Sequence, residues 1–186
     1  MNGERIAALL AEHGFQAAEI PMDKLVYTED SRSYCAANKC RSYGASWACP
    51  PAVGSLEKCR AECEGYSHFF LFARMYELED SLDIEGMGDA HDDFQERVDK
   101  LGEDIRSETA DFLLLNNEGC SRCDECTYPD APCRFPEQLY PSIEGYGFLV
   151  SELAKQAGIP YMNGKSTVTF CGAVLYDENG LLSQEE

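Results

Sequence analysis

Apolar side chains are concentrated in two segments of the chain that contain few polar residues. Residues 67–78 (SHFFLFARMYEL) and 167–176 (TVTFCGAVLY) are rich in aromatic and aliphatic side chains. Short apolar runs of this kind are typical of buried strands. Residues 90–111 instead repeat apolar side chains every three or four positions, which predicts an amphipathic helix. Its apolar positions are Phe94, Val98, Leu101 and Ile105.

Weaker local signals predict the remaining elements. Helices are expected over residues 3–12, from Ser55 to about residue 64 and from Ser142 to about residue 156, and strands over residues 18–21 and 112–115. Serine is a preferred N-cap and glycine a frequent helix stop, and such residues flank these helices. Residues 30–54 contain two glycines and two adjacent prolines and are expected to be irregular.

Helices and strands alternate along the chain, which is typical of a layered α/β or α+β fold. We expect a small mixed sheet with flanking helices and with two cysteine-rich metal-binding loops in the connections. The length of 186 residues fits a single metal-binding domain over residues 1–186.

The charge of the chain limits its partners. It has 34 acidic and 15 basic residues and a formal net charge of −19. Such a surface repels phosphate backbones and anionic lipids, so nucleic acid and membranes are not expected partners. The first 14 residues lack the continuous apolar segment of a signal peptide, and no apolar run approaches a membrane span. We therefore expect a cytoplasmic protein, whose acidic surface is compatible with docking onto a basic redox partner.

Ten cysteines lie mainly in two loops, at residues 33–63 and 119–136. In the reducing cytoplasm, metal ligation or catalysis is a better expectation for them than disulfide bonds. The second cysteine loop has the spacing Cys120-x2-Cys123-x2-Cys126-x6-Cys133, with Pro136 after two further residues. Three cysteines at successive x2 spacings are typical of ligands to a [4Fe–4S] cluster. Zinc, the alternative, prefers paired C-x2-C units that are further apart.

The first cysteine loop has the pattern Cys35-x4-Cys40-x8-Cys49-Pro-Pro, which matches no common ligand spacing throughout. Cys59 is the nearest candidate for a fourth ligand to a second metal centre. Cys63 and Cys171 are expected to be small buried apolar residues. Trp47 lies two residues before Cys49, where an aromatic ring is equally compatible with shielding a cluster or with ordinary packing.

Three segments resemble a family of uncharacterised prokaryotic proteins described as predicted metal-binding proteins (DUF2284-like). They are CAANKCRSYGASWACPPAVGSLEKC, ELEDSLDIEGM and CSRCDECTYPDAPCRFPEQLYPSIEGYGFLVSEL, and the resemblance extends from about residue 33 to 174. It implies metal ligation by Cys35, Cys40, Cys49, Cys120, Cys123, Cys126 and Cys133, with Cys59 as a further ligand. It implies no reaction, and no catalytic residue is assigned.

The leading hypothesis is an iron–sulfur protein that transfers single electrons to a redox partner. It would carry one or two clusters, with a [4Fe–4S] cluster on the second loop. Two alternatives stay open, a structural zinc-binding interaction module and a metalloenzyme or activator with an open iron position. Whether the chain is an enzyme is left open by the sequence. An exchange of ligands between the two cysteine loops would require them to be neighbours in space.

Overall fold

A computed structural model describes residues 1–178. Within this part the chain forms five α-helices, two short 3-10 helices and four strands. The elements are α1 (Gly3–Glu12), β1 (Gln16–Glu19), η1 (Met22–Lys24), α2 (Glu29–Ala36), α3 (Leu56–Cys63), β2 (His68–Glu77), α4 (Ile84–Glu108), β3 (Phe112–Leu115), η2 (Pro136–Gln138), α5 (Val150–Ala157) and β4 (Thr167–Tyr176). The predicted α/β fold is confirmed.

The strands form one sheet in the order β1-β2-β4-β3, and all neighbouring strands are antiparallel. The two long apolar strands lie at its centre and pair from His68↔Tyr176 to Glu77↔Thr167. The sheet is small, as predicted, but its named strands are not mixed in direction. An isolated parallel bridge joins Asn116 to Ser142 outside them.

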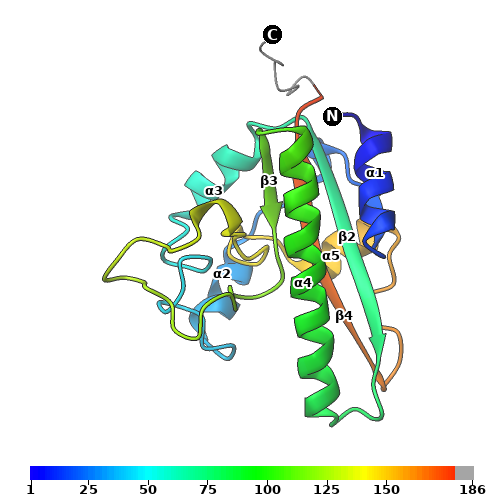
Figure 1. Ribbon diagram of the computed structural model, residues 1–186, viewed down its shortest axis with the longest axis vertical. Helices are drawn as coiled ribbons and strands as arrows, with labels where there is room; N and C mark the ends of the chain where they lie inside the picture. Colours follow the sequence, from blue (N-terminus) through cyan, green and yellow to red (C-terminus); the bar gives the residue numbers. More distant parts are fainter. Residues whose placement is uncertain (179–186) are drawn as a thin grey trace.

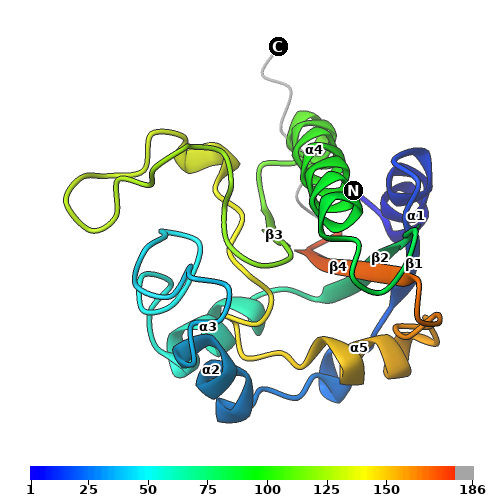
Figure 2. The same cartoon turned by 90° about the horizontal axis from the view of Figure 1, so that it is seen from below.

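Helices cover both faces of the sheet (Figure 1), which lies as a middle layer between α1 and α4 on one side and α3 and α5 on the other (Figure 2). Successive side chains of a strand point to opposite faces, so each central strand supplies two cores. Phe70 and Phe72 pack beneath α1 and α4, whereas Phe69 and Leu71 pack against α3 and α5. This two-sided burial explains why β2 and β4 are apolar along most of their length.

Three helix starts differ from the prediction. Thr28 accepts a hydrogen bond from the Asp30 amide and caps α2, which extends into the segment expected to be irregular. Asp83 caps α4 by accepting from the Gly86 amide, so this helix begins six residues before Ala90. Both differences arise because a side-chain cap outweighs the low helix propensity of the residues that follow.

The third difference concerns the segment before α5. Ser142 accepts a hydrogen bond from the Gly145 amide, but this closes only a turn. Gly147 has a φ of +89°, in the left-handed region, so helix cannot continue through it and α5 begins at Val150. Strand β1 also lies two residues earlier than predicted. None of the helices described within residues 1–178 has the length and apolar character required to cross a membrane.

Candidate metal centres

The two cysteine loops are neighbours in space, although about 60 residues separate them in sequence. Both project from the same side of the sheet, beyond β3 (Figure 2). The Cys49 thiol lies 4.0 Å from the carbonyl oxygen of Glu118, and the Ser142 amide donates to the carbonyl oxygen of Ala48 at 2.8 Å. The spatial condition for exchanging ligands between the loops is therefore met.

The second loop surrounds a small cavity of about 20 Å³. All four of its cysteines line this cavity, together with Trp47 from the first loop: Cys120, Cys123, Cys126 and Cys133. Backbone amides point at two of the sulfurs. The Phe135 amide donates to the Cys133 sulfur at 3.4 Å, and the Arg122 amide donates to the Cys120 sulfur. Such N–H···S bonds are among the interactions by which proteins tune a cluster.

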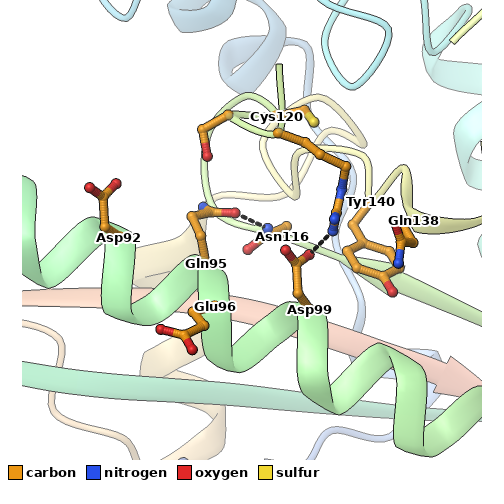
Figure 3. A pocket seen from close by; sticks show the side chains of 10 residues that line it. Asp92, Gln95, Glu96, Asp99, Asn116, Cys120, Gln138 and Tyr140 are labelled. Atoms are coloured by element: carbon orange, nitrogen blue, oxygen red, sulfur yellow. Dashed lines mark hydrogen bonds and ion pairs between the residues drawn. The ribbon is translucent and has the colours of Figure 1, made fainter. Parts of the chain in front are cut away.

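Helix α4 holds the second loop in place (Figure 3). The side-chain amides of Asn116 and Gln95 are hydrogen-bonded at 2.5 Å, and the Asp99 carboxylate forms an ion pair with Arg122. Burial raises the pKa of Asp99, while Arg122 opposes this shift. Arg122 lies between two of the cysteines, so the ion pair fixes the loop where the thiols converge. The sequence analysis did not predict the ion pair between Asp99 and Arg122, because no local pattern links α4 to this loop.

Three cysteines of the first loop line a second, larger cavity of about 250 Å³. Cys35 lies at the end of α2, and the turns that follow bring Cys40 and Cys49 towards it. Asn38 and Arg41 adopt left-handed backbone conformations in these turns, with φ of 51° and 64°. Strained backbone of this kind is often found at functional sites.

Residues from outside the first loop complete the cavity wall. Glu118, Ser142 and Glu144 also line the cavity, and Tyr34, Lys39, Tyr43 and Pro50 complete its lining. The Ser142 hydroxyl lies 3.8 Å from the Cys49 sulfur. The sequence prediction assigned none of Glu118, Ser142 and Glu144 to the site. Glu144 does fall within the SIEGYG segment that resembles the metal-binding family, but a carboxylate alone does not identify a ligand.

Burial keeps the thiols of Cys35 and Cys49 protonated in the metal-free protein. It raises the pKa of Cys35 to about 11 and that of Cys49 to about 12. Burial also raises the pKa of Glu144 to about 7, and the neighbouring Glu118 adds to the effect. A metal that binds these thiols must displace their protons, so binding is favoured by higher pH.

Cys59 does not line the cavity that contains the other three cysteines of its predicted set. It is fully buried on α3, where its thiol lies 3.5 Å from the Val53 carbonyl oxygen and accepts a hydrogen bond from Arg32 at 3.2 Å. Cys63 and Cys171 are also fully buried, in the core between the sheet and helices α3 and α5, as predicted.

The donor set suits a soft metal or a cluster, because thiolates select zinc, copper(I) and iron–sulfur centres. Across residues 1–178, no group of three or more His, Cys, Asp or Glu side chains is arranged so that it could hold a single metal ion. The cysteines line shared cavities, but their side chains are not arranged to bind one metal ion together. Gly119 allows the second loop to approach the first closely, because a Cβ there would clash with Ser42 and would lie 3.4 Å from the Cys49 sulfur.

These features define a small α/β protein with two adjacent cysteine-lined cavities. A family model described as "Predicted metal-binding protein (DUF2284)" matches residues 18–176, and the chain belongs to this family. The resemblance found in the sequence motifs is thereby confirmed. The family description states metal binding and names neither the metal nor a reaction. No curated protein and no solved structure matches the chain.

Proposed function

We propose that this protein binds iron–sulfur clusters and transfers single electrons to a redox partner in the cytoplasm. The second loop would hold one [4Fe–4S] cluster through Cys120, Cys123, Cys126 and Cys133. The first loop would hold a second centre through Cys35, Cys40 and Cys49, for which the sequence predicted Cys59 as a further ligand. The protein would set the reduction potentials through burial and N–H···S bonds.

The observation that carries this proposal is the convergence of four cysteines on one cavity in the second loop. A structural zinc ion requires four donors at about 2.3 Å from a single point. A four-iron cluster spreads its thiolates around a larger body. The x2 spacings of Cys120, Cys123 and Cys126, which are typical of [4Fe–4S] ligands, support a cluster over zinc at this cavity.

Electron exchange between the centres is supported by the contact between the loops. The Cys49 sulfur touches the backbone of Glu118, and Cys120 follows only two residues later. A ligand of one centre and a ligand of the other are thus separated by a short stretch of backbone. The net charge of −19 favours a partner with a basic surface, since opposite charges steer association.

Metal analysis of protein purified without oxygen tests the proposal. We expect a brown protein with iron and labile sulfide in near-equal amounts. A colourless protein that contains zinc would instead support an interaction module. Replacing Cys123 by Ser should remove the iron of one cluster, whereas Cys171→Ala, which removes a thiol outside both cavities, should leave the iron content unchanged.

Electron transfer is tested separately from cluster binding. The reduced protein should be reoxidised by a basic c-type cytochrome, and the rate should fall as ionic strength screens the attraction. If the cluster-loaded protein exchanged electrons with neither acidic nor basic acceptors, the cluster assignment would stand and the proposed electron-transfer function would be rejected.

A further inference from the structure

A further cavity lies between the second cysteine loop and helix α4 (Figure 3). This α4 cavity has a volume of about 350 Å³. Cys120, Arg122 and Gln138 line both the α4 cavity and the small cavity of the four cysteines. A group that enters the α4 cavity therefore comes to lie beside Cys120, a predicted ligand of the second centre.

Acidic side chains of α4 line this cavity. They are Asp92, Glu96 and Asp99, whose spacing of four and three residues places them on one face of the helix. Asp99 is paired with Arg122, which alone is basic among the described residues of the lining. The Asp92 and Glu96 side chains are 82% and 66% exposed. Glu96 pairs with the exposed Lys100, and such surface pairs are weak enough to be exchanged for another cation.

An exposed aromatic ring adjoins the same residues. The Phe135 side chain is 44% exposed and lines the cavity of the four cysteines. The central carbon of the Arg122 guanidinium lies 5.9 Å from the centroid of this ring. Aromatic side chains are enriched at the centres of protein–protein interfaces, where they supply much of the binding energy. The ring is an observation independent of the acidic residues, and it indicates a protein partner at this place.

We infer that a basic redox partner docks on the face formed by Asp92, Glu96 and Phe135, places a lysine or arginine side chain in the α4 cavity, and receives electrons from the second centre past Cys120. This inference rests on the proposed function, because it requires a cluster at the second loop. In each transfer the reduced cluster loses one electron and the oxidised centre of the partner, such as a ferric haem, gains it. No covalent bond forms or breaks.

Charge alone does not select this face, because the whole chain has a net charge of −19. The face is distinguished by three features that occur together: exposed carboxylates, an exposed aromatic ring and a cavity that reaches Cys120. Complementary charges raise the rate of encounter and fix orientation, while an apolar centre supplies affinity. A partner bound here would have its redox centre held close to the cluster.

Two double variants with equal changes in net charge test the location. Asp92→Asn with Glu96→Gln alters the docking face. Glu4→Gln with Glu12→Gln alters α1, which lies on the other side of α4 from the cysteine loops (Figure 2), and Glu12 also has an ion-pair partner, Arg5. The reduced, cluster-loaded proteins are mixed with ferricytochrome c at low ionic strength. The docking-face variant should react roughly tenfold more slowly than the wild type, within the range of electrostatic steering.

The α1 variant should keep most of the wild-type rate. Both variants should contain the wild-type amounts of iron and sulfide, since the replaced side chains lie outside the cavity of the four cysteines. Equal decreases in the two rates would show that only the overall charge matters, which would overturn the inference and leave electron transfer intact. A loaded wild-type protein that does not reduce the cytochrome would remove the proposed function itself.

The aromatic contact is tested with Phe135→Ala, which keeps the backbone amide that donates to Cys133. Its rate with ferricytochrome c should be lower than that of the wild type even at high ionic strength, where charges are screened. An unchanged rate would contradict an interface at this ring.

Cross-linking locates the contact without any substitution. A carbodiimide activates a carboxylate, and a lysine amine of the cytochrome then displaces the urea and forms an amide bond. Mass spectrometry of the digested complex should find these bonds at Asp92 or Glu96. Cross-links found only on α1 or on other surfaces would overturn the inference.

Discussion

The indole nitrogen of Trp47 donates a hydrogen bond of 3.1 Å to the carbonyl oxygen of Ala131, which ties the first cysteine loop to the second. The same indole packs edge-on against Tyr128, with ring centroids 4.9 Å apart, and lines the cavity of the second loop. Of the two roles expected for this residue, the structure confirms packing, whereas shielding of a cluster stays a prediction.

Replacing Trp47 by Phe should loosen the second cavity. The variant loses the hydrogen bond to Ala131, at a cost of about 1 kcal/mol, and part of the ring contact. We expect an iron chelator to remove iron from the variant roughly fivefold faster than from the wild-type protein. The far-UV circular dichroism should be unchanged, because Trp47 lies outside the helices and strands. An unchanged rate of iron loss would show that the indole does not protect the cluster.

Replacing Asp99 by Asn should destabilise the second loop more than the rest of the fold. The variant keeps the shape of the side chain but leaves the Arg122 guanidinium without its ion-pair partner. Since Asp99 is about one third exposed, we expect a loss of about 1 kcal/mol rather than the larger cost of breaking a fully buried pair. Hydrogen exchange measured across residues 119–136 should increase. Glu96→Gln on the same helix, whose Lys100 partner is exposed, provides the control.

Alkylation of the metal-free protein should distinguish the three cysteines of the first cavity. Cys40 is exposed and should react first with iodoacetamide at pH 8. Burial raises the pKa of Cys35 to about 11 and that of Cys49 to about 12, so few of these thiols are ionised and both should react slowly. Mass spectrometry of digested protein gives the order. Loading with iron and sulfide should protect Cys40, and equal labelling before and after loading would exclude it as a ligand.

Glu144 should make the stability of the metal-free protein depend on pH. Its pKa is raised from 4.5 to about 7, chiefly by burial, so the folded state binds its proton more tightly than the unfolded state does. This contribution to stability is complete below pH 4.5 and is lost as the pH rises through 7. The variant Glu144→Gln does not titrate. Denaturant unfolding should therefore show the wild type losing stability relative to the variant across this range, and parallel curves would contradict the assigned shift.

Local patterns predicted those parts of the fold that depend on neighbouring residues. Helix α1 and strands β3 and β4 have the predicted bounds, and β2 differs by one residue at each end. Apolar runs and caps act over a few positions, so they can be recognised without the rest of the chain. The errors occurred where two local signals compete, as at Asp83, whose cap begins α4 before Gly86 and Gly88, two residues of low helix propensity.

The candidate metal centres were predictable only in part. The spacing of the cysteines in the second loop indicated that four thiols could meet, because a short loop limits how far its members can separate. The first loop contains no such restriction for Cys59, which lies on a helix and faces the core. The sequence analysis predicted burial for Cys63 and metal ligation for Cys59, but both thiols lie in the core between α3 and the sheet.

The sequence by itself determined the cysteine pattern, the apolar strands and the membership of a metal-binding family. Only the tertiary structure decided which side chains meet across the first cavity. Cys49 and Ser142 lie 93 positions apart in the sequence, but the Cys49 sulfur is 3.8 Å from the Ser142 hydroxyl oxygen. Contacts at such separations depend on how the sheet and its helices pack as a whole, because burial of the two cores sets where each loop emerges.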